Sequence, residues 1–431
     1  MSFGEKIIFQ MTQLGNRDIL VFGVPKKRTQ SDGGDRMAKI VILGGGYAGM
    51  MAATHLEQLG ESFTLVNAHE YHYLTTLLHE AAGGRSDVHN YCIPIRDILT
   101  KRTSELVVDK VKTINRENRT VTLENGELSY DYLVYAIGWV PEFFGIPGLA
   151  EYSLGIRDLE SAKEIRQHIE ERFKKYKETQ DSRDLRIVVG GAGLTGIELL
   201  GELMEFLPQL CQQLDIDFSL VDVQCIEAMP SILPQVAPPL RDVAAKTLTD
   251  KGAKLRIGIK ILKVEPNKVI LEGADPVEAS TIIWTGGVRA NPLLQELGFT
   301  CDRRGRAKVT PYLQSVDDER IFIGGDSAWC DDEQGRPLPP TAQVATQMGT
   351  TIAKNLHALV HGHKEEMKSF RPSLKGTLAS LGREVGVGDM GGIPVRGMVA
   401  SLAKEATKVK YLWELGGMRL TAEKTQQVVQ L

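Results

Sequence analysis

The chain has 431 residues, which a prior of about 150 residues per domain divides into two or three domains. Charged residues make up 25% and hydrophobic residues 42%, proportions that exclude a collagen, a coiled coil and an intrinsically disordered chain. The 51 basic and 55 acidic residues give a formal net charge of −4, which argues against general attraction to nucleic acid. The five cysteines form no C-x-x-C pair, so neither a disulfide scaffold nor a cysteine zinc site is predicted.

The first 36 residues contain no apolar run that could form the core of a secretory signal. We expect residues 1–36 to be an unstructured extension. An alternative hypothesis is that they are not native coding sequence and that Met37 is the native start, because residues 33–36 could be encoded by a purine-rich run that looks like a bacterial ribosome-binding site. No stretch of about 18 uninterrupted apolar residues follows, so no membrane span is predicted.

A glycine-rich turn follows the first predicted strand. Residues 39–43 have the short, β-branched pattern of a buried parallel strand, and they run into the sequence GGGYAG at residues 44–49. Gly44 would permit the tight turn, Gly46 would let a pyrophosphate approach the backbone, and Gly49 would let the next helix pack on the strand. The first N–H groups of that helix would bind phosphate.

The next predicted strand, over residues 63–66, ends at Asn67. This position usually holds an acid that binds the ribose of a dinucleotide. The amide of Asn67 can still hydrogen-bond a hydroxyl group, without a full charge. Asn67 and its neighbour Ala68 are therefore predicted to be among the contacts of the first dinucleotide.

The same pattern returns later in the chain, with a strand over residues 185–190, the sequence GAGLTG at residues 191–196 and a helix after it. The partner strand ends at Glu227. A carboxylate there would accept hydrogen bonds from both ribose hydroxyls and repel a 2′-phosphate, which predicts NADH rather than NADPH. The alternative is a solvated acid at a strand end. Two fingerprints imply two dinucleotides in one chain, the organisation of a flavoprotein reductase that uses FAD.

Three further segments indicate how the domains are connected. Residues 130–138 (YDYLVYAIG) resemble the segment of two-dinucleotide flavoproteins in which the chain returns to the FAD domain, and residues 281–287 form a matching crossing. Residues 320–326 (RIFIGGD) resemble the flavin motif in which a strand-end carboxylate, here Asp326, binds the ribityl chain. Between the fingerprints, residues 106–111 and 119–123 alternate like antiparallel strands.

These segments predict an α/β fold with two Rossmann-like domains, the NADH domain being inserted in a discontinuous FAD domain. A C-terminal helical segment would associate with a membrane. The predicted boundaries are 1–36 for the extension, 37–150 and 285–370 for the FAD domain, 151–284 for the NADH domain and 371–431 for the C-terminal segment.

Three classes of flavoprotein reductase remain to be separated. A disulfide reductase needs a C-x4-C pair near the flavin, but residues 71–80 contain no cysteine. A sulfide:quinone oxidoreductase needs cysteines on the flavin face, and Cys330 has no convincing partner. The sequences EYHYLTTLLHE at residues 70–80 and PTAQVATQ at residues 340–347 are similar to those of type II (non-proton-pumping) NADH:quinone oxidoreductases. From Met37 nearly to its C-terminus, the chain resembles that family.

The resemblance implies that NADH reduces non-covalently bound FAD, which passes electrons to a membrane quinone (menaquinone or ubiquinone) in the respiratory chain without pumping protons. It implies an enzyme on the cytoplasmic face of the bacterial cell membrane and leaves a homodimer open. The alternatives are a sulfide:quinone oxidoreductase and a flavin-binding redox sensor that turns over slowly. The predicted cofactor contacts are Gly44, Gly45, Gly46, Tyr47, Ala48, Asn67, Ala68, Val111, Asp326, Ala342, Gln343 and Lys404 for the flavin side, and Gly191, Gly193, Gly196 and Glu227 for NADH.

The catalytic residue implied by the resemblance is Glu198, which lies two residues after Gly196 and close to the start of the predicted helix. The alternative is an acid that interacts only with the helix dipole. Gln343 and Gln347 are four residues apart and share a helical face, where their amides would suit a quinone carbonyl, and the resemblance adds Lys404 to this quinone site. Val111 would make a backbone contact near the adenine, or else be a core valine.

The C-terminal segment carries an apolar stripe at helical spacing, formed by Met398, Leu402, Ala406, Val409 and Trp413. Residues 395–424 hold six basic and three acidic residues. This pattern suits a helix lying in an anionic membrane surface. The alternative is a packed core or dimer helix. No metal site is predicted, and His69, His72 and His79 are interpreted as packing or surface groups.

Overall fold

The computed structural model describes residues 38–101 and 103–429. The predicted extension over residues 1–36 and the alternative start at Met37 lie outside these residues. Among the helices described, none combines the length and the apolar character that crossing a bilayer requires.

The first sheet is parallel, with the strand order β21-β9-β1-β2-β5. All four residues of the central strand β1 are buried, as expected for a strand covered on both faces. Because β21 pairs with β9, the chain beyond residue 320 returns to the sheet in which it began. The strands are β1 (Ile40–Leu43), β2 (Phe63–Asn67), β5 (Ser104–Val108), β9 (Tyr132–Tyr135) and β21 (Ile321–Ile323).

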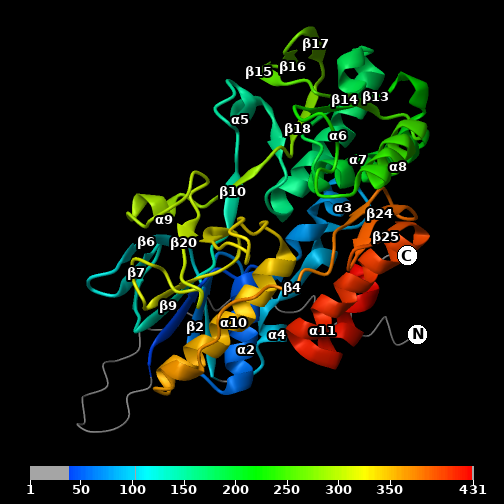
Figure 1. Ribbon diagram of the computed structural model, residues 1–431. Coiled ribbons are helices and arrows are strands. Elements are labelled where there is room, and N and C mark those ends of the chain that lie inside the picture. The colour runs from blue at the N-terminus through cyan, green and yellow to red at the C-terminus, as the bar shows by residue number, and fades with distance from the viewer. Residues whose placement is uncertain (1–37, 102, 430–431) are drawn as a thin grey trace, which may run out of the picture. The chain divides into compact units, whose positions relative to one another are not determined.

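Two helices, α2 (Tyr47–Leu59) and α10 (Ala342–Val360), pack side by side next to this sheet (Figure 1). A Cβ atom added to Gly349 would lie 2.2 Å from the carbonyl oxygen of Ala48. The two helix backbones therefore approach more closely than any side chain at residue 349 would allow.

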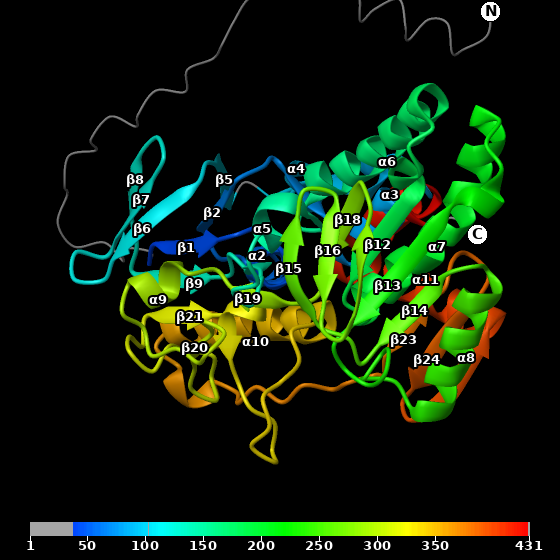
Figure 2. The ribbon, with the colours of Figure 1, turned by 90° about the horizontal axis from the view of Figure 1, so that it is seen from above.

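The second sheet repeats this plan with the order β11-β18-β12-β13-β14, also parallel. Figure 2 shows it as a group of strands separate from β1, β2 and β9. Its strands are β11 (Leu154–Gly155), β12 (Arg186–Gly190), β13 (Asp222–Glu227), β14 (Lys254–Ile257) and β18 (Thr281–Trp284), and the helices of this part are α6 (Leu159–Thr179), α7 (Leu194–Leu214) and α8 (Pro238–Asp250).

Each parallel sheet is accompanied by a three-stranded antiparallel sheet. The first consists of β6 (Val111–Asn115), β7 (Thr120–Leu123) and β8 (Glu127–Ser129), and the second of β15 (Ile261–Glu265), β16 (Lys268–Leu271) and β17 (Ala274–Glu278). The antiparallel pattern predicted for residues 106–111 is wrong for its first half, because residues 106–108 belong to β5, which pairs in parallel with β2.

The crossing between the two halves is an antiparallel pair, β10 (Trp139–Pro141) with β19 (Val288–Ala290). The predicted α/β fold with two Rossmann-like domains is thus confirmed by the sheet topology. The predicted domain boundaries at residues 150, 284 and 370 stay predictions.

The C-terminal part contains an antiparallel sheet of β23 (Leu378–Ser380), β24 (Gly386–Met390) and β25 (Ile393–Gly397), which the sequence analysis did not foresee. It leads into α11 (Met398–Val428), which is interrupted at Gly416 and Gly417, where the backbone is not helical. Much of the predicted apolar stripe faces outward, since Met398 is 64% and Trp413 56% exposed.

Candidate functional site

A cavity of about 2500 Å³ lies where the glycine-rich turns of both halves meet the start of α10 and the face of α11. Of all the predicted cofactor, substrate and catalytic residues, only Gly196 does not line it. A Cβ atom on Gly196 would lie 2.0 Å from the carbonyl oxygen of Gly191, so its role is to pack α7 against the turn. The structure brings the other predicted residues together, while their individual roles stay predictions.

The first turn has the backbone that a bound dinucleotide requires. Gly44 has a φ of +99°, and a Cβ atom there would lie 2.3 Å from the carbonyl oxygen of Ala136. A Cβ atom on Gly46, by contrast, would meet no atom of the described residues within 4 Å. The open space beside Gly46, at the start of α2, fits the pyrophosphate of FAD approaching the helix N-terminus.

Asn67 supports this turn from the end of β2. Its Oδ1 accepts a hydrogen bond from the backbone N–H of Gly45 at 2.8 Å. Its Nδ2 donates to the carbonyl oxygens of His69, at 2.8 Å, and of Tyr71, at 3.3 Å. The amide therefore does what a carboxylate cannot, because it accepts from one backbone group and donates to two others.

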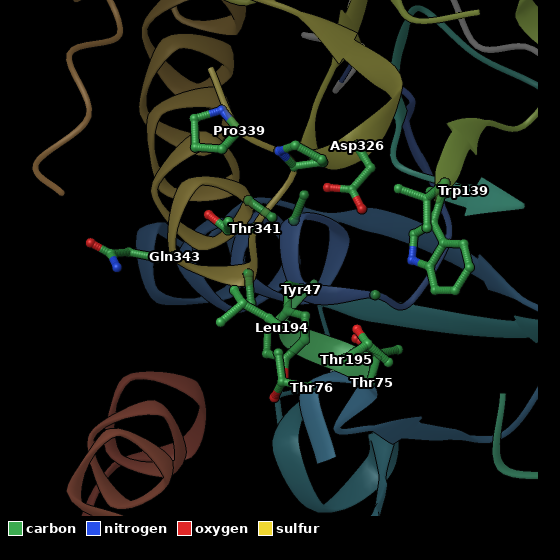
Figure 3. A pocket seen from close by; sticks show the side chains of 18 of the residues that line it. Tyr47, Thr75, Thr76, Trp139, Leu194, Thr195, Asp326, Pro339, Thr341 and Gln343 are labelled. Carbon is green, nitrogen blue, oxygen red and sulfur yellow. The ribbon is translucent and has the colours of Figure 1, made fainter. Parts of the chain in front are cut away.

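Asp326 follows β21 in a short 3-10 helix, Gly325–Ser327, and lines the cavity (Figure 3). Burial raises the pKa of Asp326 to about 6, although Arg306 opposes the shift. Its carboxylate makes no hydrogen bond or ion pair with residues 38–101 or 103–429. A half-buried carboxylate that faces the cavity without such a partner fits the ribityl hydroxyls of FAD, which would donate hydrogen bonds to it.

Several segments converge on the part of the cavity predicted to bind the flavin. Figure 3 shows the side chains of Tyr47, Leu194 and Asp326, which come from three separate segments, lining the same space. Tyr47 follows the first turn, and its hydroxyl is hydrogen-bonded to Thr76 at 2.8 Å. Thr76 lies in the predicted flavin-proximal loop, in a 3-10 helix over Thr75–Leu77.

Glu198 lies in the first turns of α7 and is paired with Lys404 of α11. Both side chains are nearly buried, with 9% and 12% exposed. The backbone N–H of Ser380 also donates to Glu198 Oε1, at 3.1 Å. Lys404 Nζ donates in addition to Ser380 Oγ, at 2.8 Å. The predicted catalytic acid therefore lies on the cavity wall with a cation and a backbone donor fixed on it.

His79 completes this cluster, although the sequence analysis interpreted it as a packing or surface group. It lies in α3 (Leu78–Ala82), with Nε2 3.4 Å from Lys404 Nζ and Nδ1 3.6 Å from Glu198. Burial lowers the pKa of His79 well below its usual value, and the cations of Lys404 and Arg85 lower it further. The ring is therefore neutral, and its Nε2 accepts from the lysine. The sequence could have indicated this position, because His79 lies in the predicted flavin-proximal loop.

A buried charge cluster joins α11 to the rest of the molecule. Lys408 Nζ lies 2.8 Å from both Glu80 and Glu405, and Arg85 forms a paired contact with Glu202 of α7. Burial opposes ionisation, but Lys408 and Arg85 hold the pKa of Glu80 below its usual value. Lys408 is only 4% exposed, so it cannot serve the predicted attraction of this segment to lipid.

The predicted quinone contacts, Gln343 and Gln347, occupy the first turns of α10 and line the cavity. Their amides also bind the passing backbone of residues 373–376. Gln343 Oε1 accepts from the N–H of Lys375, and Gln347 Oε1 accepts from the N–H of Ser373 at 2.8 Å. The two glutamines therefore hold the segment that forms one wall of the cavity.

The fold and the two turns define a class of oxidoreductase that uses two dinucleotides. Residues 38–349 match the family model described as pyridine nucleotide-disulphide oxidoreductase. A type II NADH:quinone oxidoreductase from Staphylococcus epidermidis is 36% identical over 396 residues, which cover 90% of this chain and 98% of the relative. The chain belongs to the type II NADH:quinone oxidoreductase family, as the sequence resemblance implied.

Two solved structures are similar in fold. NDH2 from Plasmodium falciparum in complex with NADH has a TM-score of 0.83 at 18% identity, covering 91% of this chain and 98% of its own. The sulfide:quinone oxidoreductase of Aquifex aeolicus has a TM-score of 0.70 at 20% identity, covering 88% of this chain and 91% of its own. At these identities the likeness concerns the fold alone.

Proposed function

We propose that this protein oxidises NADH and reduces a membrane quinone through non-covalently bound FAD, without pumping protons. The observation that carries the proposal is the single cavity that both glycine-rich turns share with Glu198 and Lys404. The chemistry that FAD supplies is acceptance of a hydride from NADH and release of two electrons to the quinone. Family membership supports this function over the sulfide-oxidising alternative.

The second turn is suited to NADH. Among residues 38–101 and 103–429, no atom lies within 4 Å of a Cβ atom added to Gly193, which leaves room for the pyrophosphate. Glu227 lies at the end of β13 and lines the cavity, and its two oxygens accept from the N–H groups of Ala192 and Met229 at 2.7 Å. Each oxygen keeps a lone pair for a ribose hydroxyl, while the negative charge disfavours the 2′-phosphate of NADPH.

The Glu198–Lys404 pair would act at the meeting point of the nicotinamide, the flavin and the quinone. We propose that Glu198 orients the nicotinamide or relays a proton, and that the Lys404 ammonium stabilises negative charge that develops on the flavin or the quinone. Ser380 and His79 hold the ammonium in place through Oγ and Nε2. Gln343 and Gln347 would offer their remaining donor and acceptor positions to a quinone carbonyl.

The proposal is tested by anaerobic stopped-flow measurement of flavin absorbance. We expect NADH to bleach the flavin within the dead time or shortly after, and a soluble quinone analogue to restore the colour. Sulfide in place of NADH should leave the colour unchanged. A flavin that NADH bleaches but quinone does not restore would contradict the proposal and favour a slow redox sensor, and bleaching by sulfide would favour the sulfide-oxidising alternative.

Glu198→Gln separates chemistry from folding in the same experiment. The substitution leaves the Lys404 ammonium nearly buried without its carboxylate, so we expect quinone reduction to slow by about 100-fold, as for loss of one preorganised electrostatic group. Glu178→Gln, an exposed glutamate on α6, is the matched control. Wild-type rates in Glu198→Gln would remove Glu198 from the reaction.

We propose that α11 and the β24–β25 hairpin rest on the cytoplasmic face of the bacterial cell membrane. Large apolar side chains project from these elements, and a long-tailed quinone requires its reductase to reach the bilayer surface. The exposed fractions are 68% for Ile393, 64% for Met398, 56% for Trp413 and 72% for Met418. The competing occupant of this surface is a second copy of the chain, in a homodimer.

Vesicle cosedimentation distinguishes the two occupants. Met398→Glu and Met418→Glu should each weaken binding to anionic vesicles about tenfold, because a charge replaces apolar area that enters the lipid. Leu220→Glu, at an apolar residue 52% exposed on the other half of the molecule, should leave binding unchanged. A variant that keeps vesicle binding but halves the mass in analytical ultracentrifugation would assign the surface to the homodimer.

A further inference from the structure

A cluster of metal-ligating side chains lies outside the redox cavity. His357 belongs to the last turn of α10, His361 caps the end of that helix, and Glu61 follows the end of α2. None of the three lines the cavity. His357 is 14 residues from Gln343 along α10, a separation of about 21 Å at 1.5 Å per residue. The cluster therefore has no part in the function proposed above.

The three side chains meet at one atom. Glu61 Oε1 lies 2.5 Å from His357 Nδ1 and 2.8 Å from His361 Nε2. The two rings are 4.6 Å apart between centroids, as expected for histidines four residues apart on one helical face. All three potential ligand atoms lie within 4.8 Å of one another.

The backbone that carries these groups is held in place. Gly60 ends α2 with a φ of +85°, and the N–H of Glu61 donates to the carbonyl oxygen of Leu56 at 3.0 Å. The close contact of Gly349 with α2 fixes α10 beside it. The carboxylate and the two rings are thus presented by two helices whose relative position is set by the core.

We propose that Glu61, His357 and His361 form a binding site for one zinc ion, which links the end of α10 to the end of α2. Two imidazoles and one carboxylate are ligands that zinc prefers. Zinc–nitrogen and zinc–oxygen bonds of about 2.0–2.2 Å place tetrahedral ligands about 3.4 Å apart. The present distances of 2.5 and 2.8 Å reach this geometry when each side chain moves by less than about 1 Å.

The remaining coordination position would be open to water. The side chains of His357 and His361 are 36% and 54% exposed, whereas that of Glu61 is 14% exposed. Zinc can therefore enter from solvent without unfolding of the chain. Magnesium and calcium are excluded by ligand chemistry, since they prefer sets made entirely of oxygen ligands.

The test uses the full-length, tag-free protein with its flavin, freed of metal by a chelator and titrated with zinc chloride by calorimetry. We expect one zinc ion to bind per chain, and magnesium chloride not to compete. Zinc in 100-fold excess over its dissociation constant should raise the melting temperature by about 3 °C, because it binds only the folded chain.

Variants locate the ion. His361→Ala and Glu61→Gln should each lower zinc affinity at least about tenfold, as expected when one of three protein ligands is lost, and abolish the thermal shift. Their flavin content and unshifted melting temperature report folding. His363→Ala is the matched control, because His363 lies two residues beyond His361 in a separate, exposed group with Glu365.

Each outcome decides the proposal. Unchanged affinity in His363→Ala with loss in the other two variants supports it. Loss in His363→Ala alone would move the ion to the exposed group and overturn it. Failure of the metal-free wild-type protein to bind zinc would leave the cluster as hydrogen bonds between Glu61 and the two histidines, which also overturns it.

Discussion

The two glycine-rich turns have nearly the same backbone and different supports. Gly44 and Gly191 have φ values of +99° and +98°. In each turn a strand-end side chain accepts a hydrogen bond from the turn, Asn67 Oδ1 from Gly45 and Glu227 Oε2 from Ala192. The backbone requirement is therefore shared by any bound dinucleotide, and only the supporting side chain distinguishes the two sites.

The supports differ in what else they hold. Glu227 is an acceptor only, and its second oxygen takes the N–H of Met229. Asn67 donates to His69 and Tyr71 and so ties the first turn to the flavin-proximal loop. His72, from β3 (Tyr71–Tyr73), adds a second support, because its Nδ1 is 2.8 Å from the carbonyl oxygen of Gly45. The second turn is held from another segment, because Thr285 Oγ1 donates to the carbonyl oxygens of Gly190, at 2.9 Å, and of Gly191, at 3.1 Å. The two turns thus differ in which segments hold them, and Asn67 and His72 tie the first one to the predicted flavin-proximal loop.

The largest expected effect comes from filling the open space at each turn. In Gly46→Val and Gly193→Val the new Cβ atom has no atom of the described residues within 4 Å, so both variants should fold. Gly46→Val should be purified without flavin. Gly193→Val should keep its flavin and show a KM for NADH raised about 10- to 100-fold, since an overpacked site costs about 1–3 kcal/mol. The flavin absorption band and steady-state kinetics measure the two results, and flavin loss in both variants would contradict separate sites.

The second expected effect is a pH dependence that belongs to the first turn. Burial lowers the pKa of His72 to about 4, and the hydrogen bond to Gly45 only partly opposes this. Between pH 6.5 and 4 the unfolded chain binds a proton at this residue and the folded chain does not, so stability is complete above pH 6.5 and is lost as pH falls through about 4. The loss at His72 is about 3 kcal/mol.

The measurement is the free energy of unfolding against pH in wild type and His72→Gln. The amide can still donate to Gly45 but does not titrate, so the difference between the two curves isolates His72 from Asp326 and the other acids. Parallel curves between pH 6.5 and 4 would show that His72 is not held neutral.

The smallest expected effect comes from exchanging the amide and carboxylate groups of the two supporting side chains, Asn67 and Glu227. Asn67→Asp keeps the acceptor for Gly45 but loses both donors and places a charge beside two carbonyl oxygens, so we expect a loss of about 2 kcal/mol of stability and weaker flavin retention. Glu227→Gln keeps one acceptor and removes the charge. It should raise the relative use of NADPH without changing flavin content, as measured by kcat/KM for the two nucleotides. An unchanged nucleotide preference would contradict the role of Glu227.

Local motifs made most of the fold and much of the cavity predictable from sequence. The tight turn requires Gly44, and the close packing of the helix on the strand requires Gly49, so both leave a pattern in consecutive residues. The order of the motifs along the chain indicated how the chain returns to its first sheet. The predicted residues Asn67, Glu227 and Asp326 line one cavity. They could be predicted because each follows a strand that a local motif identifies.

What could not be predicted depends on partners distant in sequence. The two donors of Asn67, the binding of residues 373–376 by Gln343 and Gln347, and the neutral state of His79 all follow from tertiary contacts. Residues 106–108 were wrongly predicted to be part of an antiparallel strand over 106–111, because β5 lies at the edge of its parallel sheet and is only partly buried. The strands over residues 378–397 are short, and their glycine-rich sequence gives little periodicity.

The burial of charges on the inner face of α11 has a consequence for how the C-terminal segment can be studied. Besides Lys404 and Lys408, this face carries Tyr411, whose hydroxyl is 2.9 Å from His72 Nε2. Cutting the chain before residue 395 would remove the charged partners that Glu80, Arg85 and Glu198 have in the interior. It would also remove the Tyr411 contact of His72, the side chain that supports the first glycine-rich turn. A truncated protein would therefore lose its fold before its membrane binding could be measured. The inner face of α11 is part of the protein interior, and only its outer face is apolar and exposed.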